Sequence, residues 1–189
     1  LFNSISTGKA EAANFPFCTI EPNLGVVTVP DSRVDELTKL VKPEKTIPTT
    51  INFVDIAGLV KGASKGEGLG NKFLSNLREV DLLIHVVRCF ENDNIVHVNG
   101  KIDPIFDKEI IDYELIIKDL DTVDKRIDKI SKQAVTGDKE KKIEFDILSF
   151  CKTHLEDGKS LRSLDLEANQ IIWIKHLNLI TLKPLIYVA

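Results

Sequence analysis

The segment Ile51-Asn52-Phe53-Val54-Asp55-Ile56-Ala57-Gly58 decides the fold. Its apolar residues predict a strand that ends at Asp55, and a glycine follows three residues later. An aspartate in this place can hold Mg²⁺ through water while the N–H of Gly58 approaches a terminal phosphate. Taken alone, the Asp-x-x-Gly pattern also suits a strand that ends in an ordinary turn.

A glycine-rich stretch follows directly. Five of the ten glycines of the chain lie between Gly58 and Gly70. This density makes the backbone expensive to order and positive φ accessible, which suits a loop that becomes ordered around a ligand and is released afterwards. A flexible linker is the alternative, although a linker is not expected between a Mg²⁺-type aspartate and a helix.

Strands and helices alternate on both sides of this segment. Apolar runs predict strands at residues 24–29, 49–55, 82–87 and 185–188, and periodic apolar positions predict helices near 34–41 and at 71–79. The run at 82–87 is apolar throughout, as expected of a strand covered on both faces. The alternation predicts an α/β fold with a mostly parallel sheet and helices on both faces.

One long helical segment interrupts the alternation. Apolar residues spaced by three and four form a coiled-coil seam: Ile116, Leu120, Val123, Ile127 and Ile130. A turn at 136–138 is followed by a second stripe of Ile143, Ile147, Leu148, Cys151 and Leu155, which ends before Gly158. Two helices of similar length are therefore predicted to pack as an antiparallel hairpin. We expect residues 109–177 to form an inserted helical domain, and residues 1–108 and 178–189 a nucleotide-binding domain.

The charge of the chain is modest overall but uneven. The net charge of -4 gives no general attraction for nucleic acid or for an anionic membrane. Between residues 125 and 142, however, seven Lys or Arg residues face three acids. The hairpin tip therefore suits contact with RNA phosphates, and a solvated charged surface is the alternative. The apolar runs are too short to cross a bilayer, and the unclustered cysteines favour a reducing, cytoplasmic setting.

The segment 14–23 is an apolar and aromatic loop bounded by prolines, with Thr19 near its centre. A threonine offers a hydroxyl and a carbonyl, which are suitable oxygen ligands for Mg²⁺. Phe15 and Phe17 are expected to pack. We therefore assign Thr19 to the metal.

These segments together resemble the YchF/Obg-like ATPase family. The resemblance rests on residues 14–23, 53–73 and His85-Val86-Val87-Arg88-Cys89-Phe90-Glu91-Asn92-Asp93-Asn94, which look like the switch I, switch II and following-strand signatures. It extends from Leu1 to the strand before Ala189, so nearly the whole chain is covered. It implies a P-loop NTPase fold of the G-domain type with the helical hairpin inserted.

The resemblance also implies roles for single residues. Thr19 would be the switch I ligand of Mg²⁺, Asp55 the Walker B-type aspartate, and Gly58 the sensor of the γ-phosphate. Leu59 stands where many relatives of Ras carry a water-orienting glutamine, and its apolar side chain cannot orient water. His97 is similar in position to the histidine to which the family assigns that role, and a packed loop residue is the equal alternative. His85, within a predicted buried strand, is expected to be structural.

The remaining expectations concern what would flank the chain. It contains no methionine and opens at Leu1, which predicts a piece of a longer protein. The resemblance implies a Gly-x-x-x-x-Gly-Lys-[Ser/Thr] loop before Leu1, and a base-recognition motif and a small TGS domain after Ala189. The chain alone is thus expected to bind nucleotide poorly and to be inactive.

The implied function is a Mg²⁺-dependent nucleotide switch that hydrolyses ATP, or GTP, with K⁺ as a candidate activator. The implied partner is the ribosome, reached through the hairpin and the C-terminal domain. A non-hydrolytic regulator and an RNA-contacting module are the alternatives. The residues present here do not decide between ATP and GTP.

Overall fold

The computed structural model describes residues 1–189 except 7–21, 57–68, 93 and 98–99. The chain divides into two compact units, Leu1–Gly58 and Leu59–Ala189, and each is described by itself.

The first unit is built on a pair of antiparallel strands. β1 (Asn23–Thr28) pairs with β2 (Thr50–Asp55), in a register that runs from Asn23 opposite Asp55 to Thr28 opposite Thr50. This pairing differs from the parallel arrangement that the alternation of elements suggested. The connection does not cross over a sheet face: it continues the ladder through Val29 N–H and Thr49 O and turns back beyond the strand ends, as in a long hairpin.

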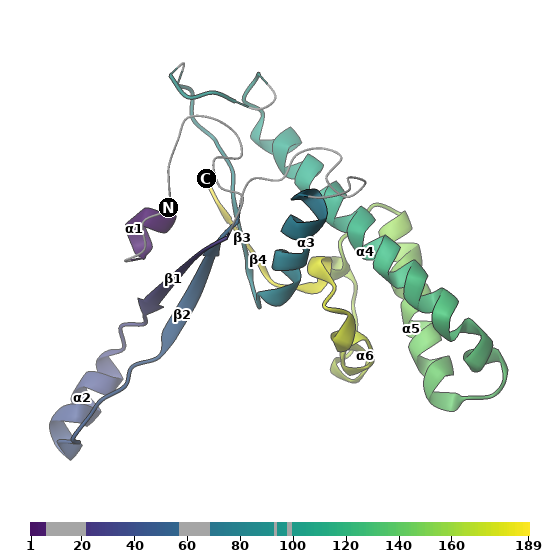
Figure 1. Ribbon diagram of the computed structural model, residues 1–189, viewed down its shortest axis with the longest axis horizontal. Helices are drawn as coiled ribbons and strands as arrows, with labels where there is room; N and C mark the ends of the chain where they lie inside the picture. Colours follow the sequence, from purple (N-terminus) through teal and green to yellow (C-terminus); the bar gives the residue numbers. More distant parts are fainter. Residues whose placement is uncertain (7–21, 57–68, 93, 98–99) are drawn as a thin grey trace. The chain divides into compact units, whose positions relative to one another are not determined.

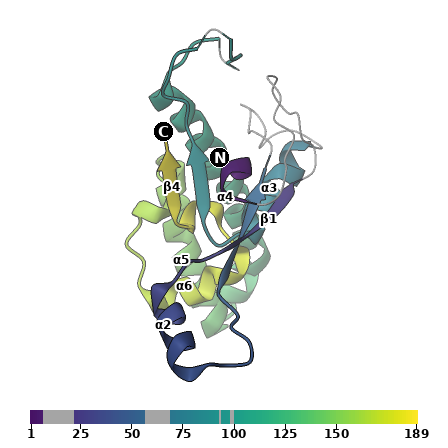
Figure 2. The same cartoon turned by 90° about the vertical axis from the view of Figure 1, so that its left-hand side faces the viewer.

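The helix within that connection is α2 (Ser32–Val41). The side chain of Asp31 caps it by accepting from the N–H of Arg33, and Lys42 ends it in the left-handed conformation with φ of 48°. None of its residues is buried. Figure 1 shows α2 beyond the ends of β1 and β2, and Figure 2 shows the same helix at the lower end of the turned view. Its apolar stripe, although predicted correctly, therefore covers neither strand.

A short helix, α1 (Phe2–Ile5), lies close to β1. A Cβ atom at the buried Gly25 would stand 2.6 Å from Cβ of Ser6 and 2.9 Å from the ring of Phe2. Glycine is therefore needed at this position of β1 because only a residue without a side chain leaves room for the chain beside it.

The second unit contains the parallel pair of the structure. β3 (Leu83–Val86) lies beside β4 (Leu185–Val188), with Leu83 opposite Leu185 and Val86 opposite Val188. Helix α3 (Leu69–Glu79) packs on this pair through Leu74, which is fully buried with Leu83, Leu115 and Ile180. The other side of β3 is more open than its continuous apolar run predicted, since Val86 is 58% exposed.

The predicted hairpin forms the largest part of the second unit. α4 (Pro104–Val135) and α5 (Lys139–Glu156) run side by side in opposite directions, and Figure 1 shows α4 as the longer helix. Asp103 caps α4 by accepting a hydrogen bond from the N–H of Phe106. Asp138 caps α5 in the same way, with bonds from two N–H groups of its first turn. The expected similarity in length was wrong, because α4 has 32 residues and α5 has 18.

The hairpin core follows most of the predicted seam. Ile116, Val123, Ile130, Ile147, Leu148, Cys151 and Leu155 are buried together, with Leu120 and Ile127 partly buried at the edge. Ile143, assigned to the second stripe, is 44% exposed, and the neighbouring Glu144 is buried instead. The division into domains at 109 and 177 stays a prediction.

The segment after α5 closes the core from the side. It comprises η1 (Leu161–Ser163), α6 (Ala168–Ile174), η2 (Lys175–Leu177) and η3 (Ile180–Leu182). The fully buried Asp119 of α4 fixes η3, the last part of this segment. Its carboxylate accepts hydrogen bonds from the N–H of Ile180 at 3.0 Å, the N–H of Thr181 at 2.6 Å and the hydroxyl of Thr181 at 2.8 Å. The start of β4 is therefore tied to the hairpin.

Candidate functional site

Asp55 lies at the end of β2, as predicted. It is half-buried, and its carboxylate makes no hydrogen bond or ion pair with any residue that the structure describes. A carboxylate left open at a strand end is a suitable hard oxygen ligand, directly or through water. Within the described ranges, no three His, Cys, Asp or Glu side chains gather into a cluster that could hold a metal. Any Mg²⁺ at Asp55 would thus take its other ligands from phosphate, water or residues outside those ranges.

Three of the predicted positions lie outside the described residues. Thr19, Gly58 and Leu59 fall within 7–21 and 57–68. The roles assigned to them as metal ligand, phosphate sensor and apolar replacement for glutamine stay predictions.

His97 lies between β3 and α4 and is held by an acid. Its Nε2 is 3.0 Å from Oδ2 of Asp107, and the two side chains are only 16% and 20% exposed. Asp107 belongs to the first turn of α4, and Gly100, at φ of 70°, donates its N–H to the carbonyl of His97 at 3.1 Å. The imidazole is therefore oriented from a rigid helix rather than carried on a free loop.

Arg88 supports the same loop from its other end. The guanidinium donates to the carbonyls of Phe90 at 3.1 Å, Asn92 at 3.0 Å and Ile95 at 3.0 Å. Neither this clamp nor the pairing of His97 with Asp107 follows from local sequence. No local signal singled out Asp107, because the helical segment was predicted from residue 109 on, and an acid in the first turn of a helix is common for dipole reasons alone.

His85 occupies β3, at a half-buried position. Its ring centroid is 5.6 Å from that of Tyr187 on β4, at a tilt of 43°. Burial lowers the pKa of His85 below its usual value, with nearby Asp112 opposing the effect. A neutral ring packed on an aromatic neighbour fits the structural role expected for this histidine.

Some of the basic side chains at the hairpin tip are paired with acids and others are not, among the residues that the structure describes. Arg126, Lys141 and Lys125 are paired with acids of the hairpin. Four exposed lysines make no ion pair with any residue in the described part of the chain: Lys129, Lys132, Lys139 and Lys142. The tip is thus a cationic surface, as the sequence predicted.

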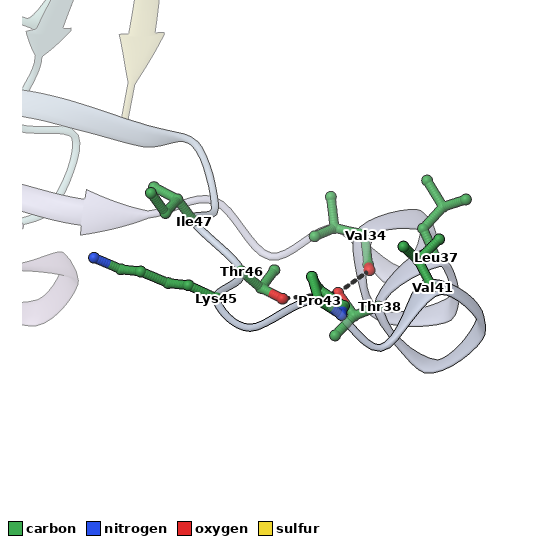
Figure 3. Close-up of a pocket in the computed structure, with 8 residues that line it drawn as sticks. All are labelled: Val34, Leu37, Thr38, Val41, Pro43, Lys45, Thr46 and Ile47. Carbon is green, nitrogen blue, oxygen red and sulfur yellow. Dashed lines mark hydrogen bonds between the residues drawn. The ribbon is translucent and has the colours of Figure 1, made fainter.

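A shallow apolar hollow of about 270 Å³ lies between α2 and the segment that follows it. Figure 3 shows Val34, Leu37 and Val41 on one side and Ile47 on the other, with the hydroxyl of Thr38 donating to Val34 O at 2.7 Å. No predicted site residue lines it.

A family model described as 50S ribosome-binding GTPase matches residues 1–135. The chain belongs to this family. Within the family of 50S ribosome-binding GTPases, two similar proteins are the ribosome-binding ATPases YchF of Escherichia coli O157:H7 and Bacillus subtilis (strain 168). Each is 56% identical over 189 residues, which is 100% of this chain and 52% of the relative. The chain thus spans about half the length of the curated relatives it matches.

A solved structure agrees with this membership. The YchF GTPase of Schizosaccharomyces pombe superposes with a TM-score of 0.71 at 41% identity, over 93% of this chain and 48% of that one. The resemblance to the YchF/Obg-like family is therefore confirmed, as is the α/β fold of the P-loop NTPase class. None of the described helices of this family member is long and apolar enough to cross a membrane.

Proposed function

We propose that this chain belongs to a nucleotide-dependent switch that hydrolyses ATP, with GTP as the alternative substrate, and contacts the ribosome. Its relatives carry names that describe ribosome-binding ATPases and a GTPase. The observation that carries the catalytic part is the contact of His97 Nε2 with Oδ2 of Asp107 at 3.0 Å.

The pair gives His97 the arrangement of an oriented base. With Nε2 directed at Asp107, the ring is held in one orientation, from which an imidazole can position the attacking water or take a proton from it. The aspartate holds the ring, which is how a third group orients the base in hydrolases of other folds. Such a base is needed because Leu59 offers no polar group where glutamine would stand.

Asp55, Thr19 and Gly58 are proposed to serve the nucleotide. The open carboxylate of Asp55 suits a Mg²⁺ ion bound with the nucleotide, and Thr19 would supply a further oxygen ligand. Bound Mg²⁺ would neutralise charge on the phosphate oxygens. Gly58 would donate its N–H to the γ-phosphate, and K⁺ is a candidate activator.

The hairpin is proposed to contact ribosomal RNA through its free lysines, together with the C-terminal domain implied by the family resemblance. Each phosphate neutralised by a lysine releases counterions, so binding should weaken steeply with salt. A cytoplasmic location follows from this role. A non-hydrolytic nucleotide-binding regulator is the second candidate, because Asp55 and Thr19 would serve nucleotide binding with or without hydrolysis.

Calorimetry with ATP and GTP, paired with a phosphate-release assay, tests the proposal in the protein extended to the length of its relatives. We expect hydrolysis that a chelator of Mg²⁺ abolishes. Asp55→Ala should lose the Mg²⁺-dependent rate, with Asp35→Ala, an exposed acid of α2, as the control. Turnover that is unchanged in Asp55→Ala would remove this residue from the site, and nucleotide binding without any hydrolysis would favour the regulator.

A further inference from the structure

A second hollow lies in the hairpin unit, away from His97. It has a volume of about 360 Å³ and is lined by Arg126, Lys141, Glu144, Ile172, Trp173 and His176. These residues come from α4, α5, α6 and η2, so the hollow exists only where the segment after α5 packs back on the hairpin. Figure 1 shows α6 near α5 in this unit.

The charged side of the hollow is organised around a buried acid. Glu144 is 3% exposed and accepts from Arg126 Nε at 2.6 Å, Arg126 Nη2 at 2.9 Å and Lys141 Nζ at 3.1 Å. Burial alone would raise the pKa of Glu144, but the hydrogen bonds from the two cations outweigh it and hold the pKa below its usual range. One carboxylate thus fixes two cations, and Nη1 of Arg126 keeps no partner among the described residues.

The balance of charge makes this side of the hollow positive. Two permanent cations face one carboxylate, and His176 Nε2 lies 3.5 Å from Oε1 of Glu144. A guanidinium held in a fixed plane with a free outer N–H group is a good receptor for a phosphate oxygen.

The other side of the hollow is formed by two apolar side chains, Trp173 and Ile172. Trp173 packs against the hairpin core with part of its ring and lines the hollow. Its indole N–H has no hydrogen-bond partner within the described residues. The neighbouring Ile172 is 72% exposed. An aromatic ring beside a fixed cation is the arrangement that binds a base together with its phosphate in single-stranded nucleic acids.

We propose that this hollow binds one unstacked nucleotide of single-stranded RNA, with the base against Trp173 and the phosphate on Arg126 and Lys141. The inference rests on the proposed contact between the hairpin and RNA, and it adds a specific site to that contact. RNA is favoured over an acidic peptide because the ring of Trp173 offers a base a surface for stacking, which an acidic side chain cannot use. Lys129 lies one helical turn beyond Arg126 and Lys142 is next to Lys141, which suits a chain with a charge at every repeat.

Trp173 is the single tryptophan of the sequence and reports directly on the hollow. The chain is titrated with an RNA octamer, with an abasic RNA backbone of the same length and with polyglutamate, while fluorescence and anisotropy are recorded. We expect the RNA octamer to quench Trp173 saturably, and the abasic backbone to bind without quenching.

Variants separate the hollow from the general attraction of the tip. Trp173→Ala should weaken binding of the RNA octamer about tenfold or more and leave binding of the abasic backbone unchanged. Trp173→Phe should restore most of the affinity. Phe150→Ala, at an aromatic residue of α5 that is 54% exposed and outside the hollow, is the matched control. Lys129→Ala and Lys142→Ala should weaken both polymers alike.

The outcomes are distinguishable. If the RNA octamer and the abasic backbone bind equally and neither quenches, the nucleotide site is wrong while the RNA contact of the tip stands. Quenching by polyglutamate to the same extent would also overturn the site, in favour of an acidic peptide. If none of the polymers binds, both proposals fail. Melting temperatures show whether Trp173→Ala is folded, and Trp173→Phe keeps the test valid if it is not.

Discussion

Nε2 of His97 lies 3.0 Å from Oδ2 of Asp107, so a loop histidine is anchored to the first turn of the longest helix in the described structure. This pairing turns a position suggested by resemblance into an imidazole whose orientation is set by a helix. It also links the loop after β3 to the helical hairpin, since α4 carries both Asp107 and the hairpin seam.

His97→Ala should lower kcat by about 10²-fold or more in the full-length protein, because it removes a group that acts on the attacking water. Nucleotide affinity should stay nearly intact, since such a group contributes only in the transition state. Leu59→Ala is the control, and its effect should be much smaller. Measuring kcat and nucleotide Kd for both variants decides the matter, and a wild-type kcat in His97→Ala would leave this histidine a packed loop residue.

Asp107→Ala should lower kcat less than His97→Ala, because the base is still present but no longer oriented. The double variant should be no slower than His97→Ala alone, since the two residues act as one unit. Asp121→Ala, a further acid of α4 that pairs with Lys125 on the surface, is the matched control. If the fold-losses in kcat of the two single variants multiply in the double variant, the aspartate does not act through the histidine.

Leu120→Asp and Ile127→Asp should each destabilise the hairpin by placing a carboxylate against apolar neighbours. Both side chains are only partly buried, whereas Val123 between them is fully buried. Val123→Asp should therefore lower the melting temperature and the helical circular dichroism signal more than either. Tyr113→Asp, at a 60% exposed position of α4, should have little effect. Unchanged helicity in all three seam variants would mean that the seam is not an interior.

Asp119→Ala should destabilise the second unit by about 3 kcal/mol, because the N–H groups of Ile180 and Thr181 would be left buried without an acceptor. Thr181→Val removes a hydroxyl that donates to Asp119 and accepts from the Leu161 N–H at 3.4 Å, while the two N–H groups keep their carboxylate, so it should cost less, about 1 kcal/mol. Denaturant unfolding of both variants measures the difference. An Asp119→Ala variant as stable as Thr181→Val would show that water replaces the carboxylate as the acceptor for the two N–H groups.

Cys151 should resist alkylation at pH 8, while Cys89 should react quickly. Cys89 is exposed, whereas Cys151 is buried and its burial raises the pKa of the thiol to about 11. A Cys18→Ser background removes the third thiol, and mass spectrometry counts the labels before and after denaturant is added. Because the folded pKa lies above the unfolded one, the thiol's contribution to stability is present below about pH 8.5 and is lost as pH rises toward 11. Rapid labelling of Cys151 in the folded chain would contradict its burial.

Elements whose signal is local were predicted well. The seam residues of α4 repeat every three or four positions, and this periodicity alone places a helix and its apolar face. The strand that ends at Asp55 and the turn at 136–138 were also placed correctly, because strand runs and turn residues are read within a few positions. Family motifs added the fold class, since they combine spacing and residue type over most of the chain.

Arrangements that join distant positions were not predicted. The helix of residues 32–41 has an amphipathic pattern, which suggested that it covers a sheet, yet it lies within a hairpin-like connection and buries none of its residues. Periodicity states that a face is apolar but not what covers it. In the same way, an apolar strand run does not state whether its partner runs parallel or antiparallel.

The sequence by itself therefore determined the helical hairpin, the strand that carries Asp55, the cationic tip and the resemblance to YchF proteins. Only the tertiary structure decided which acids are withdrawn from solvent and what they hold: the partly buried Asp107 on His97, and the buried Glu144 on Arg126 and Asp119 on Thr181. Acids are solvated by default, so residue type alone assigns them to the surface. Burial of a carboxylate becomes favourable only when donors from elsewhere in the chain converge on it, and that convergence is a property of the folded chain.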